Sequence, residues 1–171
     1  MAKNNEVTLS KDISVIKKDR MRFTKNTFSS TLCYIAILFD AFYFVFVYSI
    51  NPSEDIGKSF FYSIMIGFSV LCNLLFLLFT FLASEGVKNY SKLFSVLLIV
   101  MGVIQAMRIF GIPLLGFLEI LADGSRLISP LSFVALALLL GVSSVCCIVA
   151  GVVGIIKTTT LENYKKEIGI N

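Results

Sequence analysis

The sequence predicts an all-α integral membrane protein in which four transmembrane helices form a bundle. The first reason is composition: 57% of the 171 residues are hydrophobic and 15% are charged, against about 45–50% and 25% in soluble domains. The second reason is four apolar runs of about 18 residues or more, each long enough to cross a hydrocarbon core about 30 Å thick. The third is a one-sided distribution of Lys and Arg, which is typical of membrane proteins.

Three connections separate the predicted spans. The first span ends before Asn51 and Pro52, because proline lacks the backbone N–H that a continuing helix needs. In chain order, the predicted spans cover about residues 28–50, 60–83, 93–110 and 131–156. The chain is therefore divided into a basic N-terminal tail (1–27), a transmembrane domain (28–156) and a C-terminal tail (157–171).

The basic residues predict the orientation of the bundle. Twelve of the fifteen Lys and Arg residues lie in the two tails and in the connection between the second and third spans. The other two connections hold only Lys58 and Arg126, and Arg108 lies within a span. Because cytoplasmic segments carry the excess of Lys and Arg, we expect both termini in the cytoplasm. The Lys-, Asn-, Ile- and Phe-rich composition favours the plasma membrane of a bacterium.

The N-terminal tail contains a basic segment, KDISVIKKDRMRF, at residues 11–23. One interpretation is a short helix lying on anionic lipid headgroups, which Lys17, Lys18, Arg20 and Arg22 would contact. Each basic residue near such a surface contributes about 1 kcal/mol. The other interpretation is a flexible tail whose charges only set the topology of the spans.

Residues 112–130 are too apolar for an ordinary loop. Gly111 and Pro113 indicate a break after the third span, because proline disrupts a continuing helix. We therefore expect a short interfacial helix at this point, on the outer surface of the bundle. The alternative is that the third span continues outward.

Four polar residues share the middle of the predicted membrane. Counted along the helices, Asp40 and Gln105 lie about 18 Å from the cytoplasmic face, Asn73 about 15 Å and Arg108 about 22 Å. Asp40 is the only carboxylate and Arg108 the only basic group in the spans. A charge at the helix centre costs about 2.5–3.5 kcal/mol, so we expect these two residues to pair. Gln105 shares the helix face of Arg108, and Asn73 completes the layer.

The polar layer has two interpretations. It is either a path for an ion, a proton or a substrate, or a polar clamp that specifies which helices pair. A one-to-one acid–base pair neutralises itself and leaves no spare carboxylate for a carried cation. This favours the clamp, which would set geometry more than stability, since hydrogen bonds within membranes average about 0.6 kcal/mol.

Small residues recur along the fourth span. Ser143, Cys147 and Gly151 are spaced by four, and such a ridge allows close helix approach, either within the bundle or against another subunit. All four cysteines lie in apolar runs, so no disulfide framework is expected. The vicinal pair Cys146–Cys147 is better interpreted as small apolar filler than as a metal or redox site.

No catalytic motif accompanies this pattern. The chain has no histidine, no H-E-x-x-H, no G-x-S-x-G and no P-loop. We therefore predict a non-enzymatic structural or accessory subunit of a membrane protein complex, without a cofactor or a metal. Its expected partners are the lipid bilayer, including anionic headgroups, and either another membrane subunit or a second copy of itself, but no nucleic acid. The alternative is an oligomeric small channel or transporter that uses the polar layer.

Overall fold

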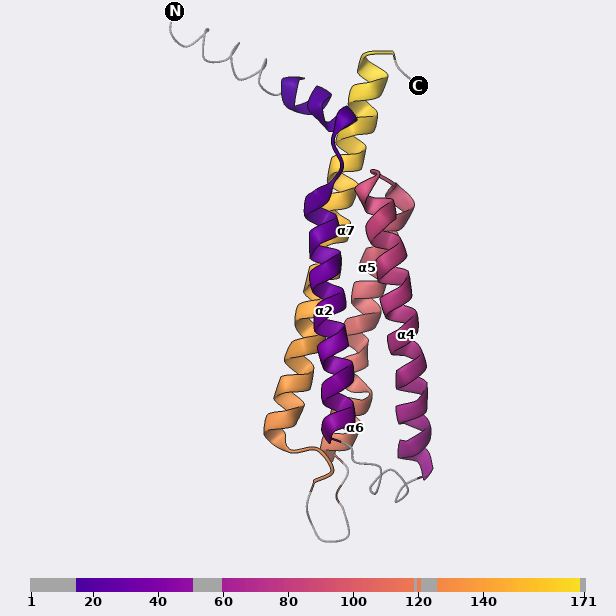
Figure 1. The fold of residues 1–171 in the computed structure, drawn as a ribbon, viewed down its shortest axis with the longest axis vertical. Helices are drawn as coiled ribbons and strands as arrows, with labels where there is room; N and C mark the ends of the chain where they lie inside the picture. The colour runs from indigo at the N-terminus through magenta and orange to yellow at the C-terminus, as the bar shows by residue number, and fades with distance from the viewer. Residues whose placement is uncertain (1–14, 51–59, 119, 121–125, 170–171) are drawn as a thin grey trace, which may run out of the picture.

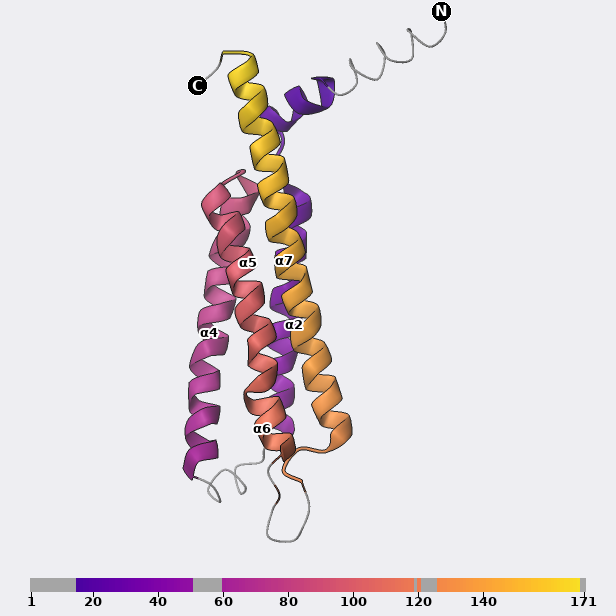
Figure 2. The same ribbon diagram turned by 180° about the vertical axis from the view of Figure 1, so that it is seen from behind.

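The four long helices of the described chain run side by side and alternate in direction (Figure 1). The computed structural model describes residues 15–50, 60–118, 120 and 126–169. In chain order, the named helices are α2 (Thr27–Ile50), α4 (Phe60–Lys88), α5 (Lys92–Met107), the 3-10 helix η1 (Arg108–Phe110), α6 (Ile112–Leu118) and α7 (Pro130–Glu167). Both described chain ends lie at the same end of the bundle, together with the α4–α5 turn, as Figure 2 also shows. We call this the termini end, and the end that holds α6 the far end.

The described chain contains four helices that are long and apolar enough to cross a membrane, which indicates a multi-pass membrane protein. The first predicted span agrees with α2 to within one residue. The second and fourth helices are longer than predicted: α4 continues to Lys88, and α7 continues beyond Ile156 to Glu167. Large apolar side chains are exposed on the outer faces, as expected of surfaces that contact lipid; examples are Leu38, Phe68 and Leu138, which are 52%, 62% and 62% exposed.

The third span differs most from its prediction. A break is present where Gly111 and Pro113 indicated one, but it is a single 3-10 turn, and the apolar stretch continues as α6 to Leu118. Proline is tolerated here because it lies in the first turn of α6, where its missing N–H has no partner to lose. Ile112, Pro113 and Gly116 are buried, and Ile128 donates its backbone N–H to the Gly116 oxygen at 3.0 Å. This stretch therefore packs against the bundle along part of its surface.

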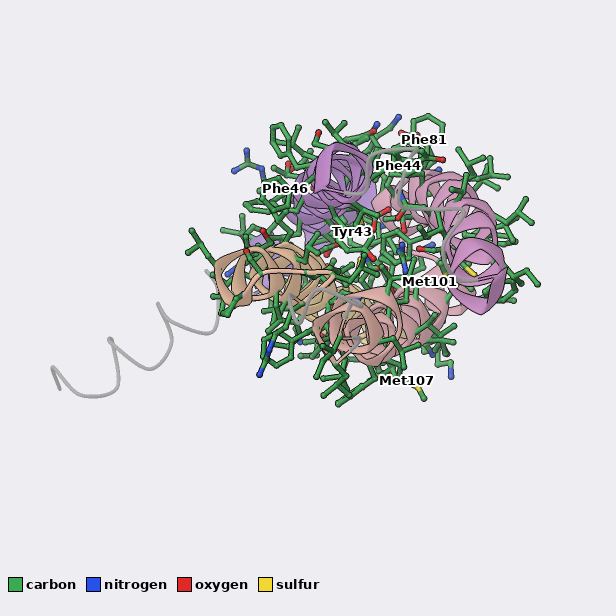
Figure 3. The ribbon with its side chains drawn as sticks, turned by 90° about the horizontal axis from the view of Figure 1, so that it is seen from below. Tyr43, Phe44, Phe46, Phe81, Met101 and Met107 are labelled. Atoms are coloured by element: carbon green, nitrogen blue, oxygen red, sulfur yellow. The ribbon has the colours of Figure 1, made fainter. Side chains whose placement is uncertain are left out.

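Each of the four long helices packs mainly against two of the others. Helices α2 and α5 both contact α4 and α7, so α2 and α5 lie diagonally across the bundle. Figure 3 looks along the bundle and shows Tyr43 among polar atoms near its centre, whereas Phe46, Phe81 and Met107 lie at the rim. Side chains therefore fill the space between α2 and α5, and these two helices can contact each other only through long side chains.

The described residues form three apolar core clusters along the bundle axis. Nearest the termini end is a cluster of Cys33, Ala83, Val87, Leu98 and Ala150. Further along α2 comes a second cluster of Ala36, Phe76, Met101 and Cys147. The third, at the far end, contains Tyr43, Val47, Ile66, Ile112, Ile128, Leu136 and Leu140. Asp40 lies between the second and third clusters on α2.

The predicted ridge of small residues lies inside this bundle. Ser143 and Cys147 are fully buried, and Gly151 is buried as well. A methyl group on Gly151 would lie 2.6 Å from the Ser95 backbone oxygen of α5, so only glycine allows this approach. About two turns earlier in α7, the Ser144 hydroxyl donates to the Gly102 oxygen of α5 at 2.7 Å. The ridge thus serves the α5–α7 and α2–α7 contacts within one chain.

Candidate functional site: a polar cluster in the bundle core

Arg108 stands at the centre of a cluster that contains all four polar residues of the predicted layer. Its Nη1 donates to Asp40 Oδ1 at 3.0 Å and to Gln105 Oε1 at 2.7 Å. Its Nη2 donates to Asn73 Oδ1. The guanidinium thus binds side chains from α2, α4 and α5 at once. Because donor and acceptor are both charged, the Arg108–Asp40 hydrogen bond belongs to the charge-assisted class, which is stronger than hydrogen bonds between neutral groups.

Gln105 extends the cluster to the fourth helix. Its Nε2 donates to Asp40 Oδ1 at 2.5 Å and to Ser143 Oγ at 3.4 Å. The Ser143 hydroxyl in turn donates to the Ala36 backbone oxygen at 3.0 Å. One connected hydrogen-bond network therefore joins α2, α4, α5 and α7 at a single level of the bundle.

Local helix geometry places these side chains. Gln105 and Arg108 are three residues apart, and so are Asp40 and Tyr43, which puts each pair on one helix face. The Tyr43 ring lies with its centroid 5.1 Å from the Arg108 guanidinium carbon, within the range of a cation–π contact. The Asp40 side chain is fully buried and that of Arg108 is 12% exposed. Carboxylate and guanidinium are thus both removed from bulk solvent and paired.

Two polar atoms in the cluster have no hydrogen-bond partner among the described residues. They are Asp40 Oδ2, an acceptor, and Asn73 Nδ2, a donor. Each is buried, and each belongs to a side chain that Arg108 binds through its other polar atom. A buried polar atom without a partner costs about 1–3 kcal/mol, so these two atoms are the places where the cluster has unused binding capacity.

The chemistry of the cluster is that of a neutral ion pair with amide ligands. The residues joined by these hydrogen bonds include no thiol and no imidazole, and the Ser143 hydroxyl already donates to a backbone oxygen. Within the described parts of the chain, no group of three His, Cys, Asp or Glu side chains is placed to hold a metal ion. What this arrangement can do is fix the relative positions of four helices and bind small polar molecules at its two unpartnered atoms.

The predicted lipid-contact residues lie away from this cluster. Residues 15–23 form a helix at the termini end, outside the four-helix section; the first part of the predicted basic segment, residues 11–14, lies outside the described residues. Lys17 and Arg20 are exposed, whereas Lys18 and Arg22 are half-buried. Arg22 Nη1 forms an ion pair with Asp19 at 3.1 Å, so one of the four charges is already partly neutralised.

A second group of hydrogen-bonded polar residues lies at the termini end, and the sequence did not predict it. Lys157 Nζ donates to Asn26 Oδ1 at 2.8 Å, and Asn26 Nδ2 donates to Ser29 Oγ at 2.9 Å. The Asn26 backbone N–H donates to the Lys88 oxygen at 3.0 Å. Asn26 therefore connects α2, α4 and α7 here. The sequence feature that could have indicated this contact is an asparagine just before the first span, because asparagine is favoured at helix N-termini.

No known protein family, curated protein or solved structure shows a significant match to this chain. The interpretation of the cluster therefore depends on its own geometry.

Proposed function

We propose that this chain is a non-enzymatic structural or accessory subunit of a membrane protein complex, formed with itself or with another membrane protein. The observation that carries this proposal is the network around Arg108, which joins four helices through one paired charge. Such a network specifies helix register and partner choice. A transported cation would need a carboxylate without a countercharge, whereas the charge of Asp40 is paired with that of Arg108.

The surroundings of the cluster support the same role. Apolar clusters lie on either side of Asp40 along α2, one with Phe76 and Met101 and the other with Val47 and Ile66. A path for ions across the membrane would require polar groups to continue through both levels.

We further propose that both termini are cytoplasmic and that the N-terminal helix lies on anionic headgroups. Among the described residues, the basic side chains that predict this orientation lie in segments that share the termini end. On the helix of residues 15–23, Ile16 and Phe23 are seven positions apart, hence on one face, and are 66% and 80% exposed. An exposed apolar face beside exposed Lys17 and Arg20 is the pattern of a helix at a lipid surface.

An oligomeric small channel or transporter is the second candidate. The unpartnered Asp40 Oδ2 and Asn73 Nδ2 favour it, because transport sites leave some polar atoms free to bind the transported species. Four spans are few for a complete transporter, so this role would require several copies of the chain.

The two roles are distinguished by native mass spectrometry of the tagged chain in lipid nanodiscs, isolated from the cells that encode it. We expect a defined complex, either with a stoichiometric foreign membrane protein or with further copies of this chain. A monomer that carries only lipid would contradict the subunit role. In the Asp40→Asn variant we expect the complex to be lost; an intact complex that has lost an ion flux would instead support the transporter.

A further inference from the structure

Lys157 is a basic residue at the termini end that pairs with no carboxylate in the described part of the chain. Its Nζ donates to the neutral side chain of Asn26 at 2.8 Å and lies 5.5 Å from the centroid of the Phe28 ring. The ion pairs that the structure describes at this end join other residues: Asp19 and Arg22, Glu85 and Lys88, and Lys92 and Glu162. Among the described residues, the half-buried charge of Lys157 is therefore bound by a neutral group and not by a counterion.

A second positive charge lies beside Lys157. The helix of residues 15–23 is next to α7 at the termini end in both views of the ribbon (Figure 1 and Figure 2). Lys17 is exposed on that helix, and it is close enough to Lys157 for the two positive charges to repel each other. An anion bound by both ammonium groups would turn this repulsion into attraction. The two lysines therefore favour the binding of a small negative group.

The position of Lys157 along α7 favours a lipid as the source of this negative group. Residues 131–156 contain no charge, and they extend over about 39 Å, close to the thickness of a bilayer with its headgroups. Lys157, the next residue, therefore reaches the level of the phosphates. Phe28 and Ile156 beside it are 54% and 60% exposed. A phospholipid supplies acyl chains that cover such apolar side chains, whereas a free phosphate leaves them uncovered.

We propose that each chain binds one anionic phospholipid at this point, with the lipid phosphate accepting hydrogen bonds from the Lys157 ammonium and lying near Lys17. An ammonium group has three N–H donors, and Asn26 accepts from one of them, so two are available to the phosphate. Hydrogen bonds between an ammonium and a phosphate belong to the charge-assisted class. This inference rests on the headgroup contact proposed above, and it replaces a diffuse attraction along the N-terminal helix by one site of defined residues.

Lipid titration of the unmodified chain tests the site. The complex is purified in a nonionic detergent, and native mass spectrometry counts the lipids that it binds as phosphatidylglycerol is added. We expect one phosphatidylglycerol per chain to bind about tenfold more tightly than phosphatidylcholine with the same acyl chains, because the choline group offsets the phosphate charge. Equal affinity for the two lipids would overturn the proposal.

Variants at the two lysines test which residues form the site. Lys157→Gln removes the charge but keeps a donor for Asn26, and it should weaken the binding of phosphatidylglycerol about tenfold. Lys17→Gln should weaken it about fivefold, as expected of one basic residue near an anionic headgroup. Lys157→Arg keeps the charge and should bind nearly as well as the unmodified chain. If Lys157→Gln does not assemble, Lys17→Gln and the comparison of the two lipids still decide the proposal.

Lys166→Gln is the matched control. Lys166 is exposed on the same helix, nine residues and about 13 Å beyond Lys157, which is farther than a screened charge acts at physiological ionic strength. This variant should leave the affinity nearly unchanged. A loss as large as that in Lys157→Gln would mean that only the net charge of the chain matters, and would overturn the site.

Two further comparisons separate this site from other forms of anion binding. Glycerol 3-phosphate in large excess should not displace phosphatidylglycerol, because it has no acyl chains; displacement would overturn the assignment to a lipid. Equal losses in Arg20→Gln and Lys157→Gln would agree with a diffuse headgroup contact of the N-terminal helix but would overturn the single site. The same spectra give the number of chains in each complex, so a monomer that binds one phosphatidylglycerol would contradict the subunit role and support the lipid site.

Discussion

Replacing Arg108 by Met should lower the free energy of unfolding by about 3–5 kcal/mol. The substitution keeps most of the side-chain length but leaves the fully buried Asp40 carboxylate without its countercharge. It also removes the hydrogen bonds to Asn73 and Gln105, so the contacts that connect α2, α4 and α5 through Arg108 are all lost. The loss is measured by SDS titration of the protein in mixed micelles, followed by circular dichroism.

The matched control is the exposed ion pair between Lys92 and Glu162. It too joins two helices, α5 and α7, but its side chains are 49% and 43% exposed. Exposed pairs contribute about 0–1 kcal/mol, so Lys92→Met should change the free energy of unfolding by no more than that. Equal losses for Arg108→Met and Lys92→Met would mean that the buried pair has no special role.

Replacing Gly151 by Ala should separate α5 from α7 and lower the free energy of unfolding by about 1–3 kcal/mol. The added methyl group would lie 2.6 Å from the Ser95 oxygen and 3.1 Å from the Ile99 nitrogen, and both are backbone atoms of α5. A flexible side chain could move aside, but a helix backbone can yield only by moving the whole helix. The same titration in mixed micelles measures the loss.

Gly141→Ala is the control for this prediction, because a methyl group at Gly141 meets nothing within 4 Å. Both positions lie within α7, so the change in helix propensity, about 0.5–1 kcal/mol in favour of alanine, is the same. We therefore expect Gly141→Ala to be neutral or stabilising. A Gly151→Ala protein as stable as the Gly141→Ala protein would contradict the close α5–α7 contact.

Run length and helix periodicity were sufficient to predict the four helices and to place three polar residues at one depth, with Arg108 one helical turn deeper. Counting residues along three spans put Asp40, Asn73 and Gln105 at one level, because each helix rises by the same amount per residue. Arg108 could be added because a long arginine side chain reaches across a turn. The position of a polar residue within an apolar run therefore predicts its depth in the membrane even where no motif is present.

Other contacts left no distinct signal in the sequence. Ser143 is one of several small residues in the fourth span, and nothing in that pattern distinguishes the serine that accepts from Gln105. The sequence predicts a tail from residue 157, because Lys157, Lys165 and Lys166 end the apolar run, whereas α7 continues to Glu167. Tertiary contacts stabilise the extension of α7: Leu161 and Tyr164 are buried, and Lys157 donates a hydrogen bond to Asn26.

The pairing of Asp40 with Arg108 is the central claim, and exchanging the two charges tests it most directly. The free energy of unfolding in mixed micelles is compared for Asp40→Arg, Arg108→Asp and the variant that carries both changes. Each single change places two like charges in the cluster, whereas the double variant restores one acid and one base, and the amides of Asn73 and Gln105 can turn to serve either. We expect the double variant to be more stable than either single variant and to recover part of the folded yield. A double variant no more stable than the single variants would contradict the pairing and, with it, the clamp that joins the four helices.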